Sequence, residues 1–475
     1  MKAHTNSSLV ERYFDLAGHG TNLRTEVLAG ITTFVTIAYI LILNPIIMSD
    51  PYVIMGQPEM AAKIYNGVFI GTCLGAFLGT FLDAVYAKVP FAQAPGMGLN
   101  AFFAYTVVLG LGYSYSEALV VVFISGILFI VITAVGLREA IIRSIPDAIK
   151  SAITPGIGLF ITIIGLKNSG LVVDNSATLV AMVDFAAFRT ADEAARAAIA
   201  GALVALIGLI IMGILHAKHV NGAILIGILV STLAGIPMGV TNLSNLSFNL
   251  GSKLSDFLEV SFFQLDFAGL FAGENFAQTL FAVCMLVVSF SLVNMFDSIG
   301  TLMGAAKQSG MVDSKGEPMQ MRQALMADAI STAAGACLGT STVTTVVESS
   351  AGIAEGGRTG FTSVITSLLF LVSIILAPIV GVVPGCATAP ALIFVGILML
   401  SNIRDVDFSD MSNALPAFCT VVFMPFTYSI ANGVAMGLIL YCVMKLFTGK
   451  VKEIKPLTAI VALIFIVRYA FMTLG

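Results

Sequence analysis

Charged side chains are scarce in this chain. Of its 475 residues, 11% are charged and 58% are hydrophobic. Ordinary soluble proteins carry about 25% charged residues, so a water-soluble globule is excluded. The few charges nearly cancel, leaving a formal net charge of −4, and no basic surface is large enough to neutralise a run of phosphates. Nucleic acid is therefore not a predicted partner.

The usual residues of disulfide, metal and nucleotide sites are also missing. The six cysteines fall in apolar stretches and form no CxxC pair, so neither a disulfide framework nor a thiolate metal site is indicated. The four histidines do not group with carboxylates, and we expect no metal and no cofactor. The segment Glu355–Gly360 lacks the lysine that a P-loop places on nucleotide phosphates. An ATP-driven pump would therefore need a partner chain.

Long apolar stretches take the place of these sites. About fourteen of them approach the ~20 residues that a helix needs to cross the hydrocarbon core of a membrane. The sequence thus predicts an all-α polytopic protein in a lipid bilayer. The expected spans are 27–47, 64–83, 91–110, 117–136, 148–166, 196–216, 220–236, 276–305, 322–338, 341–355, 360–380, 386–401, 412–429 and 430–447. A last apolar stretch, 457–473, contains Arg468 and fits an interfacial helix better than a further span.

Basic residues favour one side of this arrangement. Most of those outside the spans, such as Arg24, Lys88 and Lys218, fall on the side of the N-terminus. The two longest loops, on the other side, are richer in acids and hold only Lys167, Arg189 and Lys253 as basic residues. By the positive-inside rule, the N-terminus is predicted to be cytoplasmic.

An echo about 235 residues apart indicates two halves of seven spans each. The run Thr154–Phe160 leading to Asn168 is matched by Ala389–Phe394 leading to Asn402. An odd number of spans turns the second half upside down, which is the inverted-repeat plan of many secondary transporters. The predicted domains are a cytoplasmic tail 1–26, a first repeat 27–236, an extracytoplasmic loop 237–275, a second repeat 276–447 and a C-terminal segment 448–475.

The third and tenth expected spans occupy matching places in the two halves, and both are interrupted. The third contains Pro95, Gly96 and Gly98, whereas the tenth is rich in hydroxyls and closes with glycines. Such interruptions free backbone N–H and C=O groups, which are tolerated at membrane depth only where they line a cavity. A substrate site is expected beside these two segments.

An acid, Asp297, lies inside the eighth expected span, where an ionised carboxylate is costly unless it faces protein or water. It belongs to a polar stripe on one helix face, at intervals of three and four, formed by Ser291, Asn294, Asp297, Ser298 and Thr301. One interpretation is a polar contact between helices. Because such packing needs hydroxyls and amides but no carboxylate, we favour a functional acid.

A second acid, Glu348, lies in the interrupted tenth span, three residues after Thr345. A carboxylate beside freed backbone amides offers acceptors and donors together, which suits the edge of a heterocycle that carries N–H groups next to acceptors. The alternative is that Glu348 marks a span end and lies in water. We favour the first interpretation, because Glu355 and Arg358, three residues apart, fit the end of the span better, where ion pairing or solvation is usual.

Four stretches of the sequence resemble the motifs of a known family. They are Thr21–Tyr39 with Asn44-Pro45, Ala94–Phe103, Asn294–Thr301 and Val347–Gly352. They resemble the AzgA-like purine permeases of the nucleobase–ascorbate transporter family, and the resemblance covers nearly the whole chain. It implies a fold similar to that of the bacterial uracil transporter, with two inverted repeats of seven spans, a core domain and a gate domain, and usually a homodimer.

The resemblance also implies which residues bind the substrate. The acids that would hold the base and couple the proton are Asp297 and Glu348. The further expected contacts are Gly96, Met97, Gly98, Asn100, Thr345 and Val347. An interhelical hydrogen bond is an equally open interpretation for Asn100. The chain departs from the uracil-transporter pattern in having aspartate rather than glutamate in the eighth span, and a shorter acid would leave room for a bicyclic base.

The predicted function is therefore secondary active transport without enzymatic activity. We expect import of guanine, hypoxanthine or adenine across a bacterial cytoplasmic membrane by proton symport, with sodium a less favoured coupling ion. An anion carrier on the same fold would predict a basic residue at the interrupted spans, where acids stand instead. An intramembrane enzyme would need a pair of catalytic acids, or a set of histidines and a metal, that opens to lipid.

Overall fold

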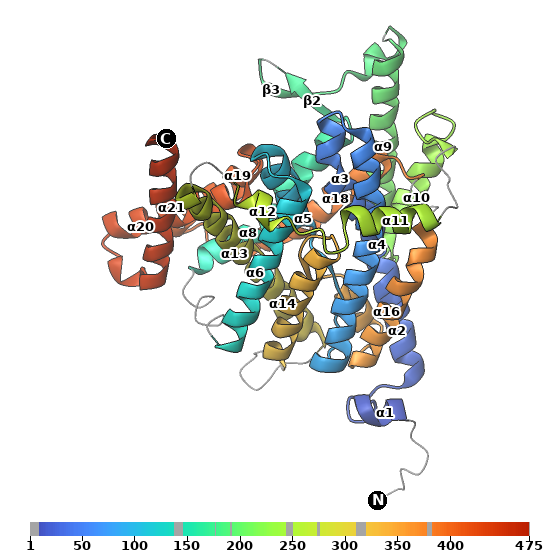
Figure 1. Ribbon diagram of the computed structural model, residues 1–475, viewed down its shortest axis with the longest axis horizontal. Helices are drawn as coiled ribbons and strands as arrows, with labels where there is room; N and C mark the ends of the chain where they lie inside the picture. The colour runs from blue at the N-terminus through green and yellow to red at the C-terminus, as the bar shows by residue number, and fades with distance from the viewer. Residues whose placement is uncertain are drawn as a thin grey trace, which may run out of the picture.

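The computed structural model describes residues 9–136, 146–175, 177–190, 192–243, 250–272, 276–309, 320–377 and 382–474, and helices dominate this part of the chain (Figure 1). Eight helical stretches among the described residues are long and apolar enough to cross a membrane: Leu23–Ile54, Pro58–Ala87, Tyr115–Ala134, Asp147–Asn168, Ala195–Ala217, Gln278–Met295, Gly385–Arg404 and Ile430–Phe447. Each coincides with an expected span, so a helical multi-pass membrane protein is confirmed. The other expected spans contain shorter helices.

One set of helices packs mainly within itself, and we call it the core group. It consists of α2 (Leu23–Ile37), α3 (Ile40–Ile54), α4 (Pro58–Leu82) with η1 (Asp83–Ala87), α5 (Met97–Ala101) with η2 (Phe102–Gly110), α6 (Tyr115–Ala134), α13 (Phe276–Ser309), α14 (Met321–Cys337), α15 (Ser349–Ala354), and α16 (Gly360–Val372) with η5 (Ser373–Leu376). The short helix α1 (Leu9–Phe14) lies beneath α16 at the end of the molecule that carries the N-terminus (Figure 1).

A second set, the gate group, also packs mainly within itself. It consists of α8 (Asp147–Asn168), α9 (Glu193–Ala217), α10 (Ala223–Gly235), α18 (Gly385–Leu400) with η6 (Ser401–Asp405), α19 (Met411–Phe426) and α20 (Ile430–Phe447). Between α8 and α9 the chain forms a hairpin of β2 (Val172–Asn175) and β3 (Leu179–Met182), followed by η3 (Phe185–Arg189). Each group therefore combines segments from both halves of the chain. After η7 (Val451–Glu453), the last apolar stretch forms α21 (Pro456–Leu474), which packs on α20.

The third and tenth expected spans are interrupted, as predicted, and they meet each other. The strands β1 (Gln93–Pro95) and β4 (Val343–Thr345) pair antiparallel, with Gln93 opposite Thr345 and Pro95 opposite Val343. Each strand leads into a short helix, α5 or α15. Extended backbone inside a membrane must find partners for its polar groups. Each interruption supplies those partners to the other.

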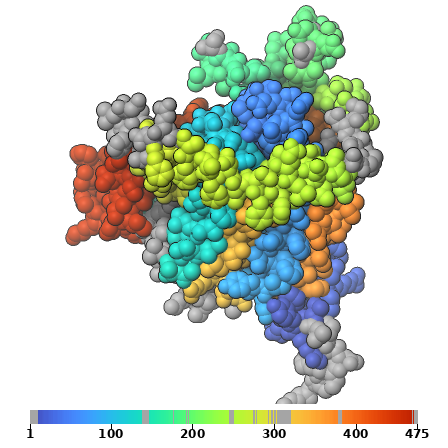
Figure 2. All heavy atoms as spheres, viewed as in Figure 1, coloured from blue at the N-terminus to red at the C-terminus, as the bar shows by residue number. Residues whose placement is uncertain are grey.

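Helices are also present in the segment 237–275, which was expected to be a loop. Among its described residues, α11 (Leu250–Val260) packs on α4, and α12 (Phe267–Leu270) packs on α6. Figure 2 shows this segment as a yellow-green band across the core group. The buried Lys253 donates a hydrogen bond to the carbonyl of Ala377 at 2.7 Å. Polar residues alternate with apolar ones in α11 and lower its hydropathy below that of a membrane-spanning helix. The segment therefore resembles an amphipathic helix that lies at the membrane surface.

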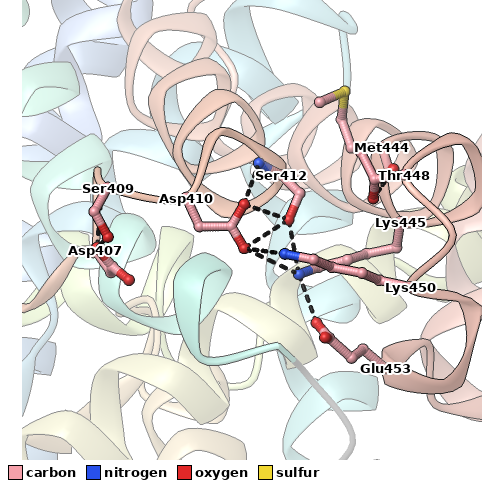
Figure 3. Close-up of polar contacts among 9 residues, drawn as sticks. All are labelled: Asp407, Ser409, Asp410, Ser412, Met444, Lys445, Thr448, Lys450 and Glu453. Atoms are coloured by element: carbon pink, nitrogen blue, oxygen red, sulfur yellow. Dashed lines mark hydrogen bonds and ion pairs between the residues drawn. The ribbon is translucent and has the colours of Figure 1, made fainter.

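A cluster of charges joins the beginning of α19 to the end of α20 (Figure 3). The carboxylate of Asp410 accepts a hydrogen bond from the backbone N–H of Ser412 at 3.0 Å and one from the Lys450 ammonium at 2.7 Å. Lys445 is 1% exposed and lies 2.6 Å from the carboxylate of Glu453. The Lys450 ammonium and the N–H of Ser412 hold the pKa of Asp410 well below its usual range.

We expect Asp410→Asn to lower the Tm of the purified protein by roughly 1–2 °C, because asparagine keeps the acceptor of the helix cap but removes the negative charge that pairs with Lys450. The folded-state pKa is depressed, so the contribution of Asp410 is fully present above the unfolded pKa of about 3.9 and is lost as the pH falls through the folded pKa. The Tm difference should therefore be constant from pH 5 to 8 and narrow only in stronger acid. Asp407→Asn is the control, since among the described residues the carboxylate of Asp407 accepts hydrogen bonds only from Ser409 in its own turn.

Candidate functional site

The best-defined polar feature of the interrupted segments is Glu348, which stands where β4 ends and α15 begins. The hydroxyl of Tyr39 donates a hydrogen bond to its Oε1 at 2.6 Å. Tyr39 is 2% exposed and lies at the break between α2 and α3, whereas Glu348 is half-buried. A carboxylate offers about four acceptor positions. One is occupied by Tyr39, so this geometry leaves acceptor capacity for a ligand.

The glycines Gly96 and Gly98 and the residue Met97 lie where β1 turns into α5. A Cβ atom at Gly98 would lie 2.5 Å from Cγ2 of Ile157, which belongs to α8 of the gate group. A larger residue at position 98 would therefore displace the Ile157 side chain. The expected backbone contacts are thus located at the boundary between the core group and the gate group.

The two expected contacts on β4 and just after it face different surroundings. Thr345 is 1% exposed, and its N–H donates to Oδ1 of Asp328 at 3.1 Å. Val347 has a side chain that is 52% exposed, next to the half-buried Glu348. The open side of this segment is therefore the side of Val347 and Glu348, whereas Thr345 points into the core group.

The amide of Asn100 is fully buried and already occupied. It donates to Oδ1 of Asn44 at 2.6 Å and accepts a hydrogen bond from the hydroxyl of Ser341. Asn44 in turn donates to Thr72 at 2.7 Å and to Thr340 at 2.9 Å. These bonds join α3, α4, α5 and the segment before β4. The arrangement favours the interhelical interpretation of Asn100 over direct contact with substrate.

Asp297 lies in α13, which packs against both β4 and α15. Its side chain is outside the part of the structure that is described. The next residue, Ser298, lies 2.8 Å from Thr344 and donates to Oδ2 of Asp328 at 2.5 Å. The helix of one acid is thus adjacent to the segment of the other. That the two carboxylates share one pocket stays a prediction.

Other members of the polar stripe form hydrogen bonds between helices. Ser291 lies 3.0 Å from the hydroxyl of Ser125 in α6, and Asn294 donates to Thr332 of α14 at 3.2 Å. The interpretation of the stripe as helix packing therefore holds for these residues.

Two residues that were not predicted as site residues support the site. Tyr39 holds Glu348, and the fully buried Asp328 ties β4 to α13. Both are polar residues inside expected spans, but nothing in the local pattern reveals their partners. Among the described residues, no three His, Cys, Asp or Glu side chains come together as a metal ion would require.

Comparison with known proteins places this geometry in context. The chain matches the model of the Permease family over residues 24–436. It is 39% identical to the adenine permease AdeP of Escherichia coli strain K12, covering 98% of this chain and 97% of that protein. It is 37% identical to the guanine/hypoxanthine permease PbuG of Bacillus subtilis strain 168, covering 98% of this chain and all of that protein.

The fold is also similar to that of a solved structure. The transmembrane domain of a cyanobacterial bicarbonate transporter, BicA, superposes with a TM-score of 0.58 at 15% identity. The similarity covers 86% of this chain and 97% of that domain. At this identity the likeness concerns the fold alone.

Proposed function

We propose, from the premise that this chain belongs to the Permease family, that it imports purine nucleobases by proton symport. Membership of the family makes the chain a transporter and not an enzyme. The proposal of a purine draws on the adenine and guanine/hypoxanthine permeases to which the chain is similar over nearly its whole length.

The observation that carries the proposal is the half-buried Glu348, whose carboxylate accepts from Tyr39 at the crossing of two interrupted spans. In a purine, ring and exocyclic N–H groups alternate with acceptor nitrogen or carbonyl oxygen atoms. A carboxylate beside backbone N–H groups complements such an edge. We propose that Glu348 accepts from the base, and that backbone groups near Val347 and from Gly96 to Gly98 supply the remaining contacts.

Proton coupling is assigned to the two acids at this crossing, Asp297 and Glu348. An acid at membrane depth is costly as an isolated charge, so a proton or a hydrogen-bonding ligand stabilises it. Loading both proton and base favours movement of the core group against the gate group, which is the alternating-access step. The close approach of Gly98 and Ile157 supports a site at this boundary.

The topology that we propose has fourteen spans in two inverted repeats of seven, with the domain limits given above. The packing of the described helices into two groups, each with segments from both halves, supports this plan. We further propose a homodimer in a bacterial cytoplasmic membrane with a cytoplasmic N-terminus.

Uptake into membrane vesicles tests the proposed function. Vesicles that contain the protein and have an alkaline interior should accumulate radiolabelled guanine, hypoxanthine or adenine in sodium-free buffer, and collapse of the pH gradient should release the label. Vesicles without the protein are the control. If accumulation occurs only with a sodium gradient, the proton assignment is wrong. If no purine accumulates under either gradient, the substrate assignment is wrong.

A further inference from the structure

A carboxylate that the proposed mechanism does not use lies near the end of α3. Oδ2 of Asp50 accepts a hydrogen bond from the hydroxyl of Tyr105 at 2.6 Å and lies 3.4 Å from Nδ2 of Asn168. The amide of Asn168 also donates to the hydroxyl of Tyr105 at 3.1 Å. These three side chains form a closed polar set, which we call the Asp50 triad.

The Asp50 triad crosses the boundary between the two helix groups. Asp50 in α3 and Tyr105 in η2 belong to the core group, whereas Asn168 is the last residue of α8 in the gate group. A second bridge runs beside it, because the hydroxyl of Thr106 donates to the carbonyl of Tyr428, between α19 and α20, at 2.9 Å. The triad lies toward the face that carries the β2–β3 hairpin, since α8 leads directly into β2.

A cavity of about 150 Å³ lies beside the triad. Leu43 and Asp50 line it from the core group, and Asn168, Thr388 and Leu392 line it from the gate group. Walls that face a void make few dispersion contacts with each other. Van der Waals adhesion between α3 and α18 is therefore weak at this point, and beside it the hydrogen bonds of the triad join α3 and η2 to α8.

We propose that the Asp50 triad is a latch that closes the permeation route on the side of the β2–β3 hairpin, and that the adjoining cavity is the mouth of this route. The inference rests on the proposed function, because a latch acts only if the two groups separate during transport. Nothing in the proposed substrate site requires Asp50, so the latch is a separate element.

The chemistry of the triad suits a contact that must both hold and release. When the groups separate, Asp50 keeps the hydrogen bond from Tyr105, which lies in the same group, and loses only the donor from Asn168. Water that enters the widened cavity replaces this donor at little enthalpic cost. The carboxylate of Asp50 thus always has a hydrogen-bond donor. Because only the Asn168 amide is exchanged for water, opening is reversible.

Labelling of a cysteine in the cavity tests the latch without any substrate. Thr388→Cys is introduced into a variant whose six native cysteines are replaced, and its reaction with a membrane-impermeant maleimide is followed in intact cells. Asn168→Ala should raise the labelling rate about tenfold, because a hydrogen bond to a carboxylate shifts an equilibrium by this order. Asn175→Ala, on the exposed β2 strand, is the matched control and should leave the rate unchanged.

A charge exchange separates the latch from general damage to the fold. Asn168→Asp places two carboxylates together, and their repulsion should raise labelling at least as much as Asn168→Ala. Adding Asp50→Asn restores one carboxylate and one amide in swapped positions, and labelling should return toward the starting rate. Labelling that does not respond to Asn168→Asp, or that the exchange fails to reverse, overturns the latch.

The outcome also distinguishes failure of the latch from failure of the proposed function. Purine uptake by the parent protein together with unresponsive labelling would reject the latch alone. Responsive and reversible labelling in a protein that accumulates no purine would support the latch and reject the proposed substrate.

Discussion

Replacing Glu348 with glutamine is expected to lower purine accumulation by about 10- to 150-fold. Glutamine keeps the size of the side chain and an oxygen that can accept from Tyr39, so the substitution removes the negative charge and little else. A hydrogen bond to a charged group contributes about 1.5–3 kcal/mol, and each 1.36 kcal/mol is tenfold in an equilibrium constant. Initial rates of uptake at several purine concentrations measure the loss.

The matched control for this experiment is Glu355→Gln. Glu355 follows α15, is exposed, and accepts a hydrogen bond from Asn221 at 3.2 Å. A solvated acid of this kind contributes little through its charge, so uptake should stay near that of the parent protein. Equal losses in the two variants would show that the charge of Glu348 has no special role, and unchanged uptake in Glu348→Gln would remove Glu348 from the substrate site.

Replacing Gly352 with alanine is expected to reduce both the stability of the protein and purine uptake. A Cβ atom at this position in α15 would collide with the hydroxyl of Thr33 and lie 2.6 Å from the carbonyl oxygen of Ala29, both in α2. A carbonyl can move only with its helix. Overpacking costs typically 1–3 kcal/mol, and displacement of α15 separates Glu348 from Tyr39. We expect Tm to fall and uptake to drop more than tenfold.

Gly213→Ala provides the control with the opposite sign. Gly213 lies in α9, and a Cβ there would meet nothing within 4 Å. Alanine is favoured over glycine in a helix by about 1 kcal/mol, so Tm should be unchanged or slightly raised. If Gly352→Ala behaves in the same way, then α15 and α2 are not closely packed around Glu348, and the geometry of the site is wrong.

Local patterns predicted a large part of this architecture. Apolar length and low charge predict a helical membrane protein, and Pro95, Gly96 and Gly98 predict an interruption in the third span, because proline and glycine disfavour a continuous helix. Glu348 could be identified as a candidate from the neighbouring sequence alone. A carboxylate in an apolar segment is costly, and it is therefore kept mainly where it has a function.

Long-range contacts could not be predicted in the same way. Tyr39 and Glu348 are 309 residues apart in the sequence, and spacing along a helix carries no information about a partner at that distance. Asn100 illustrates the converse: its amide is as compatible with substrate as with another helix until Asn44 and Ser341 are seen to occupy it. The Asp50 triad likewise joins three helices that no motif connects.

The sequence by itself determined that this protein lies in a membrane, where its backbone is broken, and which acids stand beside the breaks. These properties follow from the composition and order of neighbouring residues, because hydropathy and backbone preference act over a few residues. Only the tertiary structure decided that β1 pairs with β4, that Tyr39 holds Glu348, and that Asp50 meets Asn168 across the two groups. Those contacts depend on which helices pack together, and packing is set by the whole chain.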